Sequence, residues 1–219
     1  MVTYEQIKND DAVKVYIEEA NRALAALGYT EHSFAHVVKV AETAGMLLKK
    51  LGHDERTVEL AKIAGYLHDI GNIVNRIDHS QSGAVMAFRI LDNKGMAPRD
   101  ISRIISAIGN HDEGTGMPVN EIAAALIIAD KSDVRRSRVR NTDMSTFDIH
   151  DRVNYSVYSG ELRLDSDDKT LTLALELDSA YGSVMDFFEI FLTRMSMCKN
   201  AAVTLGLSFK LVLNGQAVM

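Results

Sequence analysis

The 219-residue sequence has one cysteine, Cys198, so no disulfide can form within the chain. A chain with so little cysteine is typical of a reducing compartment. No stretch approaches the ~20 consecutive apolar residues that span a bilayer. The first residues, MVTYEQIKNDDAV, also lack the apolar core of a signal peptide. These absences predict a cytoplasmic protein with no membrane partner.

Positive charge is scarce as well, since 24 Lys and Arg face 30 Asp and Glu for a formal net charge of -6. Proteins that bind nucleic acid polymers usually carry a basic excess. We therefore expect no nucleic acid polymer as a partner, unless a local basic stripe serves that purpose. The sequence shows no internal repeat and no low-complexity segment.

Helical periodicity dominates the first two thirds of the chain, and glycine or proline marks several helix ends. The length fits one domain with an appendage. Helices are predicted over residues 4–27, over 32–51, from Asp54 through His68 to Gly71, over about 80–92, from Pro98 to about Ile108, and from Asn120 through IAAALIIAD into DKSDVRRSRVR.

After about residue 153 the pattern alternates with the period of a β-strand. The segments YSVYSGELRLD and KTLTLALELD flank SDDK and predict a β-hairpin, a long helix covers about 180–205, and LSFKLVLN predicts a last strand. The fold class is mainly α, with a helical domain over 1–153 and a small α+β extension over 154–219. Alternating leucines predict a half-buried sheet that packs on the helical body or on a second copy in a homodimer; they are Leu162, Leu164, Leu171, Leu173, Leu175 and Leu177.

Four histidines precede an aspartate directly, but only His68-Asp69 lies at the end of a mostly apolar helix. Burying an imidazole and a carboxylate is costly unless they are paired, hydrogen-bonded or bound to a cation. The negative end of the helix dipole also favours a cation there. The pair therefore predicts a metal site.

Two further residues have comparable settings. Asp130 follows eight uncharged residues, IAAALIIA, although it would also be satisfied by solvent or by Lys131. His36 is flanked by aliphatic residues, where a single histidine is more often a satisfied core residue than a ligand. His32 lies about one turn earlier and could share or exchange the role of His36.

The order His36, His68-Asp69, Asp130 resembles the H…HD…D pattern of the HD-domain superfamily of metal-dependent phosphohydrolases, over about residues 30 to 140. The segments HVVKVAETA, LHDIGN and ALIIADKSD carry the resemblance. It implies an HD-type helical bundle with Asp69 and His68 at the catalytic centre. The implied reaction is attack of metal-bound hydroxide on a phosphate monoester or diester.

The resemblance also implies that His79 and His111 bind a second metal, with Asp69 as a bridge. Imidazoles and carboxylates without a thiolate suit iron, manganese, zinc or nickel, with magnesium as a further candidate. The string HDEGTGMP is similar to the HHE…GTGYP signature of cyclic-dinucleotide phosphodiesterases. It departs from that signature at Asn110 and Met117, so this substrate is not predicted.

A basic stripe follows Asp130, with Lys131, Arg135, Arg136, Arg138 and Arg140 against one acid. Such a run is usually a solvated helix face, but its position favours phosphate binding by Lys131, Arg135 and Arg138. The expected substrate is a small phosphorylated metabolite or nucleotide. Two alternatives stay open: a non-catalytic metal-binding signalling or regulatory module, and an oligomeric scaffold in which these histidines and aspartates are structural.

Overall fold

Helix α7 (Glu121–Lys131) lies at the centre of the helical body because its sequence is apolar on every face. All residues from Ile122 to Ala129 are buried. The helix contacts α3, α4 and α6 on the body side and α9 of the C-terminal extension. Asp130 therefore projects from the end of the most buried helix of the fold.

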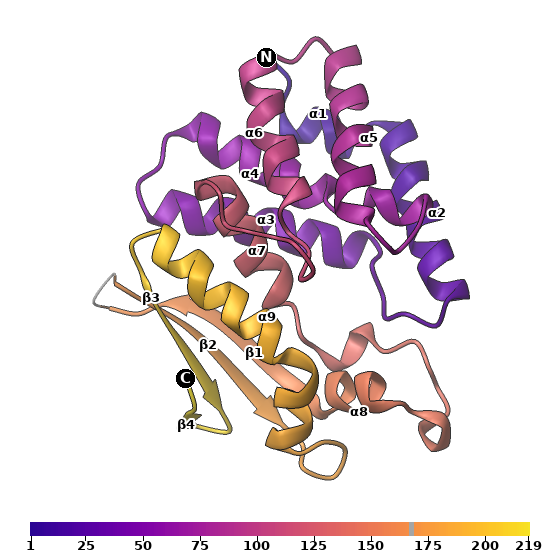
Figure 1. Cartoon of the computed structure of the whole chain (residues 1–219), viewed down its shortest axis with the longest axis vertical. Helices are drawn as coiled ribbons and strands as arrows, with labels where there is room; N and C mark the ends of the chain where they lie inside the picture. Colours follow the sequence, from indigo (N-terminus) through magenta and orange to yellow (C-terminus); the bar gives the residue numbers. More distant parts are fainter. Residues whose placement is uncertain (167–168) are drawn as a thin grey trace.

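The computed structural model describes residues 1–166 and 169–219, and Figure 1 shows a helical body followed by a small sheet with one long helix across it. This arrangement confirms the predicted fold class. The helices and 3-10 turns before the sheet are α1 (Tyr4–Lys8), α2 (Asp11–Ala26), α3 (Phe34–Lys50), α4 (Glu55–Leu67), η1 (Ile70–Ile73), α5 (His79–Asn93), α6 (Pro98–Gly109), α7, η2 (Arg136–Arg138), η3 (Met144–Thr146) and α8 (Ile149–Ser156). No helix within the described ranges is long and apolar enough to cross a membrane.

Side-chain caps explain several helix boundaries. Ser33 caps α3 and Asp54 caps α4, while Pro98 occupies the first turn of α6. The prediction of one helix over residues 4–27 is wrong. Asp10 accepts a hydrogen bond from the backbone N–H of Val13 and starts a new helix, so α1 and α2 are separate.

The predicted ends of two site-bearing helices also need correction. Helix α4 ends at Leu67 rather than Gly71, and the chain continues as η1. Helix α7 ends at Lys131, so the basic stripe does not continue the α-helix and contains only the short 3-10 turn η2. Side-chain hydrogen bonds hold this segment in place of an α-helix. The guanidinium of Arg138 donates to the backbone carbonyls of Glu31 and Asp133 at 2.9 and 3.0 Å.

Two glycines allow the helices around the site to approach closely. A Cβ on Gly65 would lie 2.7 Å from Cα of Ala41, so α4 packs against α3 only without a side chain there. A Cβ on Gly71 would collide with the backbone of His79 and Gly83 in α5. The first contact brings His68 beside His36, and the second brings α5 beside the His68-Asp69 turn.

The C-terminal sheet has the order β1-β2-β3-β4, where β1 and β2 are antiparallel, β2 and β3 parallel, and β3 and β4 antiparallel. The bounds are β1 (Val157–Leu164), β2 (Thr170–Leu177), α9 (Val184–Thr204), β3 (Ser208–Leu213) and β4 (Gln216–Ala217). The sequence did not predict β4. The predicted turn SDDK lies partly outside the described residues. Helix α9 begins later than predicted because Ser183 forms a capping box with Asp186.

The leucine face of the sheet is covered by the chain itself. Leu171, Leu173 and Leu175 are buried in the same core as Phe187 and Phe191 of α9. Helix α9 contacts β3 and also α7, so one continuous core joins the extension to the body. The proposed boundary at residues 153/154 falls inside α8, and the division into two domains stays a prediction.

Candidate metal centre

The four residues of the H…HD…D order converge from three helices. Nε2 of His36, on α3, lies 3.3 Å from Oδ1 of Asp130 and 3.6 Å from Oδ2 of Asp69. Nε2 of His68, which ends α4, lies 3.1 Å from Oδ2 of Asp69 and 3.7 Å from Oδ1 of Asp130. Two imidazole nitrogens and two carboxylate oxygens thus surround one point.

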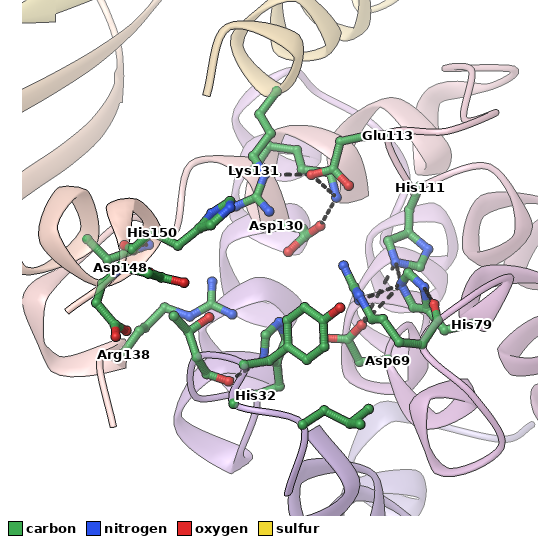
Figure 2. A pocket seen from close by; sticks show the side chains of 18 residues that line it. His32, Asp69, His79, His111, Glu113, Asp130, Lys131, Arg138, Asp148 and His150 are labelled. Atoms are coloured by element: carbon green, nitrogen blue, oxygen red, sulfur yellow. Dashed lines mark hydrogen bonds and ion pairs between the residues drawn. The ribbon is translucent and has the colours of Figure 1, made fainter. Parts of the chain in front are cut away.

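Two more histidines approach the other oxygen of Asp69. Nε2 of His79, at the start of α5, lies 3.5 Å from Oδ1 of Asp69, and Nε2 of His111, after α6, lies 4.0 Å from the same atom. The two Nε2 atoms are 3.2 Å apart. The structure therefore brings all six sequence-predicted ligands together, with Asp69 between two groups. Figure 2 shows four of them, Asp69, His79, His111 and Asp130.

Nδ1 of each of the four histidine rings faces a hydrogen-bond acceptor, which fixes the tautomer of the ring. Nδ1 of His68 donates to the backbone carbonyl of Gly65 at 2.8 Å. Nδ1 of His79 donates to that of Arg76 at 3.1 Å, and Nδ1 of His111 donates to that of Ile108 at 2.6 Å. Nδ1 of His36 donates to the carboxylate of Asp133 at 2.8 Å. When the rings are neutral, each Nε2 directs a lone pair into the cluster.

A cation fits these residues on physical grounds. Nε2 of His36, Nε2 of His68 and Oδ2 of Asp69 are buried and have no hydrogen-bond partner among the described residues. Leaving such atoms unsatisfied is costly. The sets His36, His68, Asp130 and His68, Asp69, His111 each place their ligand atoms within 4.8 Å of one another. Nitrogen and oxygen donors of this kind suit a divalent metal.

The pKa directions agree with a site that attracts positive charge. Burial opposes ionisation of Asp69 and Asp130, but nearby His68 and Lys131 respectively hold the pKa of each carboxyl well below its usual range. Burial, together with the charges of His68 and Lys131, lowers the pKa of His111 to about 3. Burial also lowers the pKa of His79. At neutral pH these two rings are unprotonated and available as ligands.

The centre opens into a cavity of about 390 Å³ lined mainly by polar residues. Figure 2 shows His79 and His111 on one side of this cavity and Asp148 and His150 on the other. The cations that line it are Arg76, Lys131, Arg138 and Arg194. The extension and α8 thus contribute to the walls of the same cavity as the helical body.

The residues of the basic stripe separate in the structure. Lys131 and Arg138 line the cavity, but Arg135 is not among its lining residues. The guanidinium of Arg135 bonds Asp133 at 3.0 Å and Glu31 at 3.2 Å. These acids direct Arg135 away from the position that the prediction assigned to it.

Several residues of the site were not assigned a role from the sequence. Asn72 donates to Oδ1 of Asp69 at 2.9 Å, and Arg76 lies 3.3 Å from Nε2 of His79. His150, one of the three other histidines that precede an aspartate, also lines the cavity. Asp133 had a sequence signal, because it lies three residues after Asp130 in the same polar segment. Arg194 had none, since it lies on a predicted helix far along the chain.

His32 and Asp112 occupy the margin of the site. His32 precedes α3 instead of lying in its first turn, and its Nδ1 lies 2.7 Å from the carbonyl oxygen of Thr30. Its ring meets that of His36 edge-on at 5.3 Å, so it is a neighbour of that ring. Oδ1 of Asp112 lies 3.8 Å from Nε2 of His79.

Comparison with known proteins finds a family match within the helical body. Residues 33–136 match the family model of the HD domain. An uncharacterized protein of Methanocaldococcus jannaschii is 26% identical over 82% of this chain and 77% of its own length. A predicted HD superfamily hydrolase from an uncultured Thermotogales bacterium is 24% identical, covers 57% of this chain and 67% of its own, and has a TM-score of 0.44.

Ribonuclease Y sequences are also similar to this part of the chain. Those of Enterococcus faecalis and Staphylococcus epidermidis are 30% and 32% identical over 54% of this chain, but the match covers only 21% of each of those proteins. The matched family region contains His36, His68-Asp69 and Asp130 in the order of the HD motif. Residues 33–136 of this chain therefore match the HD domain both in the family model and in the order of its motif residues.

Proposed function

We propose that this protein is a metal-dependent phosphohydrolase that hydrolyses a phosphate monoester or diester of a small metabolite or nucleotide. The observation that carries the proposal is the facing pair of His79 and His111. Their Nε2 atoms lie 3.2 Å apart beside Asp69, and the Nδ1 atom of each ring already donates a hydrogen bond to a backbone carbonyl. Arg76 can donate to Nε2 of His79 at 3.3 Å, so it is the lone pair on Nε2 of His111 that calls for a shared cation or proton.

The residues divide into two candidate ligand sets. His36, His68, Asp69 and Asp130 would hold one ion, and Asp69, His79 and His111 would hold a second. When bound, divalent ions supply Lewis acidity, which favours deprotonation of water near neutral pH and offsets charge on a phosphoryl oxygen. Asn72 donates to Oδ1 of Asp69 and so fixes the orientation of the shared carboxylate.

Cationic side chains beside the centre support a phosphorylated substrate. Burial lowers the pKa of Lys131, but the carboxylates of Asp130 and Glu113 outweigh that effect and raise it. Lys131 therefore stays protonated and can donate hydrogen bonds to phosphoryl oxygens. Arg138 lines the same cavity and adds a second positive charge to it, although its Nε and one terminal nitrogen already donate to backbone carbonyls.

The size of the cavity favours a small substrate over a polymer. A volume of about 390 Å³ lies within the range of small-molecule sites. The net charge of -6 also argues against a polynucleotide. The names of the ribonuclease Y relatives nevertheless make an RNA phosphodiester the second candidate substrate.

A hydrolysis screen tests the proposal, with released phosphate measured for monoesters and cleavage products separated by chromatography for diesters and RNA. Metal-free protein is reconstituted singly with Mn, Fe, Zn, Ni or Mg and assayed on nucleotides, sugar phosphates and a short RNA. We expect metal-dependent hydrolysis of a small ester, which Asp69→Ala abolishes. The control Asp92→Ala removes an exposed carboxylate of α5 and keeps activity. Cleavage of RNA alone would favour the second candidate, and no turnover at full metal occupancy would favour a non-catalytic module.

A further inference from the structure

We propose that Arg194 binds an anionic group of the substrate, so that the C-terminal extension is part of the active site. The inference rests on the proposed function and adds a specific residue to it. Arg194 lies on α9, outside the region that matches the HD family model. It nevertheless lines the cavity that contains Asp69, His79 and His111.

A chain of ion pairs connects Arg194 to the metal centre. Its Nε lies 2.6 Å from Oε1 of Glu113. The same oxygen lies 3.3 Å from Nζ of Lys131, which in turn lies 2.7 Å from Oδ2 of Asp130. Glu113 therefore holds two cations, one from each part of the fold, on the same side of the candidate ligand Asp130.

The guanidinium of Arg194 keeps free donors. Within residues 1–166 and 169–219 the terminal nitrogens of Arg194 form no hydrogen bond, and its closest ion pair is the one from Nε to Glu113. The side chain is 33% exposed, so these groups are reachable from the cavity. The guanidinium carbon lies 4.9 Å from the centroid of the Phe191 ring, which limits its rotation. A fixed fork of free N–H groups is suited to an anion with two oxygens.

The charge balance around Glu113 also leaves room for an anion. Nε of Arg194 and Nζ of Lys131 lie 2.6 and 3.3 Å from the same oxygen of Glu113. One carboxylate then faces two cations, and Asp130 is shared with the metal site. An incoming phosphate restores the balance on this side of the cavity.

The test uses inorganic phosphate as the probe and does not depend on turnover. Binding of phosphate to the metal-reconstituted protein is measured by calorimetry for wild type, Arg194→Gln, Arg194→Lys and the control Lys199→Gln. Lys199 is exposed on the same helix, and its replacement by Gln removes one positive charge, as Arg194→Gln does. We expect Arg194→Gln to weaken phosphate binding at least tenfold, Arg194→Lys to restore part of it, and Lys199→Gln to match wild type.

Metal content and melting temperature are measured on the same samples. The proposal requires that metal content stay unchanged in Arg194→Gln. Wild-type phosphate affinity in Arg194→Gln, with or without a lower melting temperature, overturns it and makes Arg194 a structural brace. Absence of phosphate binding to wild type overturns it too. Arg194-dependent binding without hydrolysis of any ester would refute the proposed function and keep this inference.

Discussion

Asp133 accepts a 2.8 Å hydrogen bond from Nδ1 of His36 and thereby fixes the tautomer of a candidate metal ligand. The carboxylate is buried and also pairs with Lys39 at 2.7 Å and Arg135 at 3.0 Å. Burial opposes its ionisation, but the hydrogen bond from His36 and the charges of Arg138 and Lys39 lower the pKa of Asp133, so it remains an acceptor. His36 therefore presents Nε2, with its lone pair, to Asp69 and Asp130.

Asp133→Asn is expected to weaken metal binding by about 10–100-fold, the usual effect of losing the partner of a ligating histidine. The measurement is a competition titration of metal against a chelator. Lys39→Gln is the matched control, because it removes a different contact of the same carboxylate. Equal metal affinity in Asp133→Asn and wild type would show that Asp133 does not orient a ligand.

Arg138→Gln and Arg135→Gln separate the two halves of the basic stripe. Both side chains pair with Asp133, but only Arg138 lines the cavity. We expect Arg138→Gln to raise the Michaelis constant for a phosphate ester about tenfold or more and Arg135→Gln to change it little, with metal content intact in both. Kinetic effects of equal size in the two variants would remove Arg138 from the substrate site.

His111 gives a pH dependence of stability in the metal-free protein. Its folded pKa is lowered to about 3, whereas an unfolded histidine titrates near ~6.5. Below the pKa of the unfolded state, the unfolded chain takes up a proton that the folded chain does not. The free energy of unfolding therefore falls as the pH is lowered from about 6.5 to about 3. The loss from pH 7.5 to 5.5 is ~1.4 kcal/mol.

Urea unfolding in the presence of a chelator checks this value. His111→Gln lacks the titrating ring, so the free energy of unfolding of wild type relative to the variant should fall by that amount from pH 7.5 to 5.5. The comparison isolates His111 from the other titrating groups. A difference that stays constant between the two pH values would mean that the ring is not held neutral.

Leu173→Ala is expected to lower the free energy of unfolding by about 2–5 kcal/mol, because it opens a cavity under α9. Light scattering on wild type and variant then tests the homodimer prediction. The leucine face is occupied by α9, so any dimer has to use another surface. A change of oligomeric state in Leu173→Ala without loss of stability would place this face at an interface.

The buried parts of the fold were the most predictable from the sequence. The run IAAALIIA defined α7 because a helix buried on all sides is apolar throughout, and the leucines of KTLTLALELD defined β2 because burial of one face leaves an alternating pattern. Boundaries that depend on a single hydrogen bond were missed. The Asp10 cap divides α1 from α2, and tertiary contacts of Arg138 replace the last helical turns after Lys131.

Local sequence context indicated the site residues that lie at helix ends. His68-Asp69 and Asp130 stood out because charge at the end of an apolar helix is unusual. Arg194 could not be found in this way, since its role depends on how α9 packs against α7 and on the position of Glu113. Pairing across about 80 residues leaves no periodic signal in one sequence.

The most direct test of the account is the metal content of the purified and reconstituted protein, measured by elemental analysis for wild type, His68→Ala, Asp69→Ala and His53→Ala. His53 is followed by an aspartate as His68 is, but it lies outside the cluster, so it controls for the dipeptide. We predict one or two divalent metal ions per chain in wild type and His53→Ala, with a sharp loss in the other two variants. Metal content equal to wild type in both His68→Ala and Asp69→Ala would contradict the proposed centre.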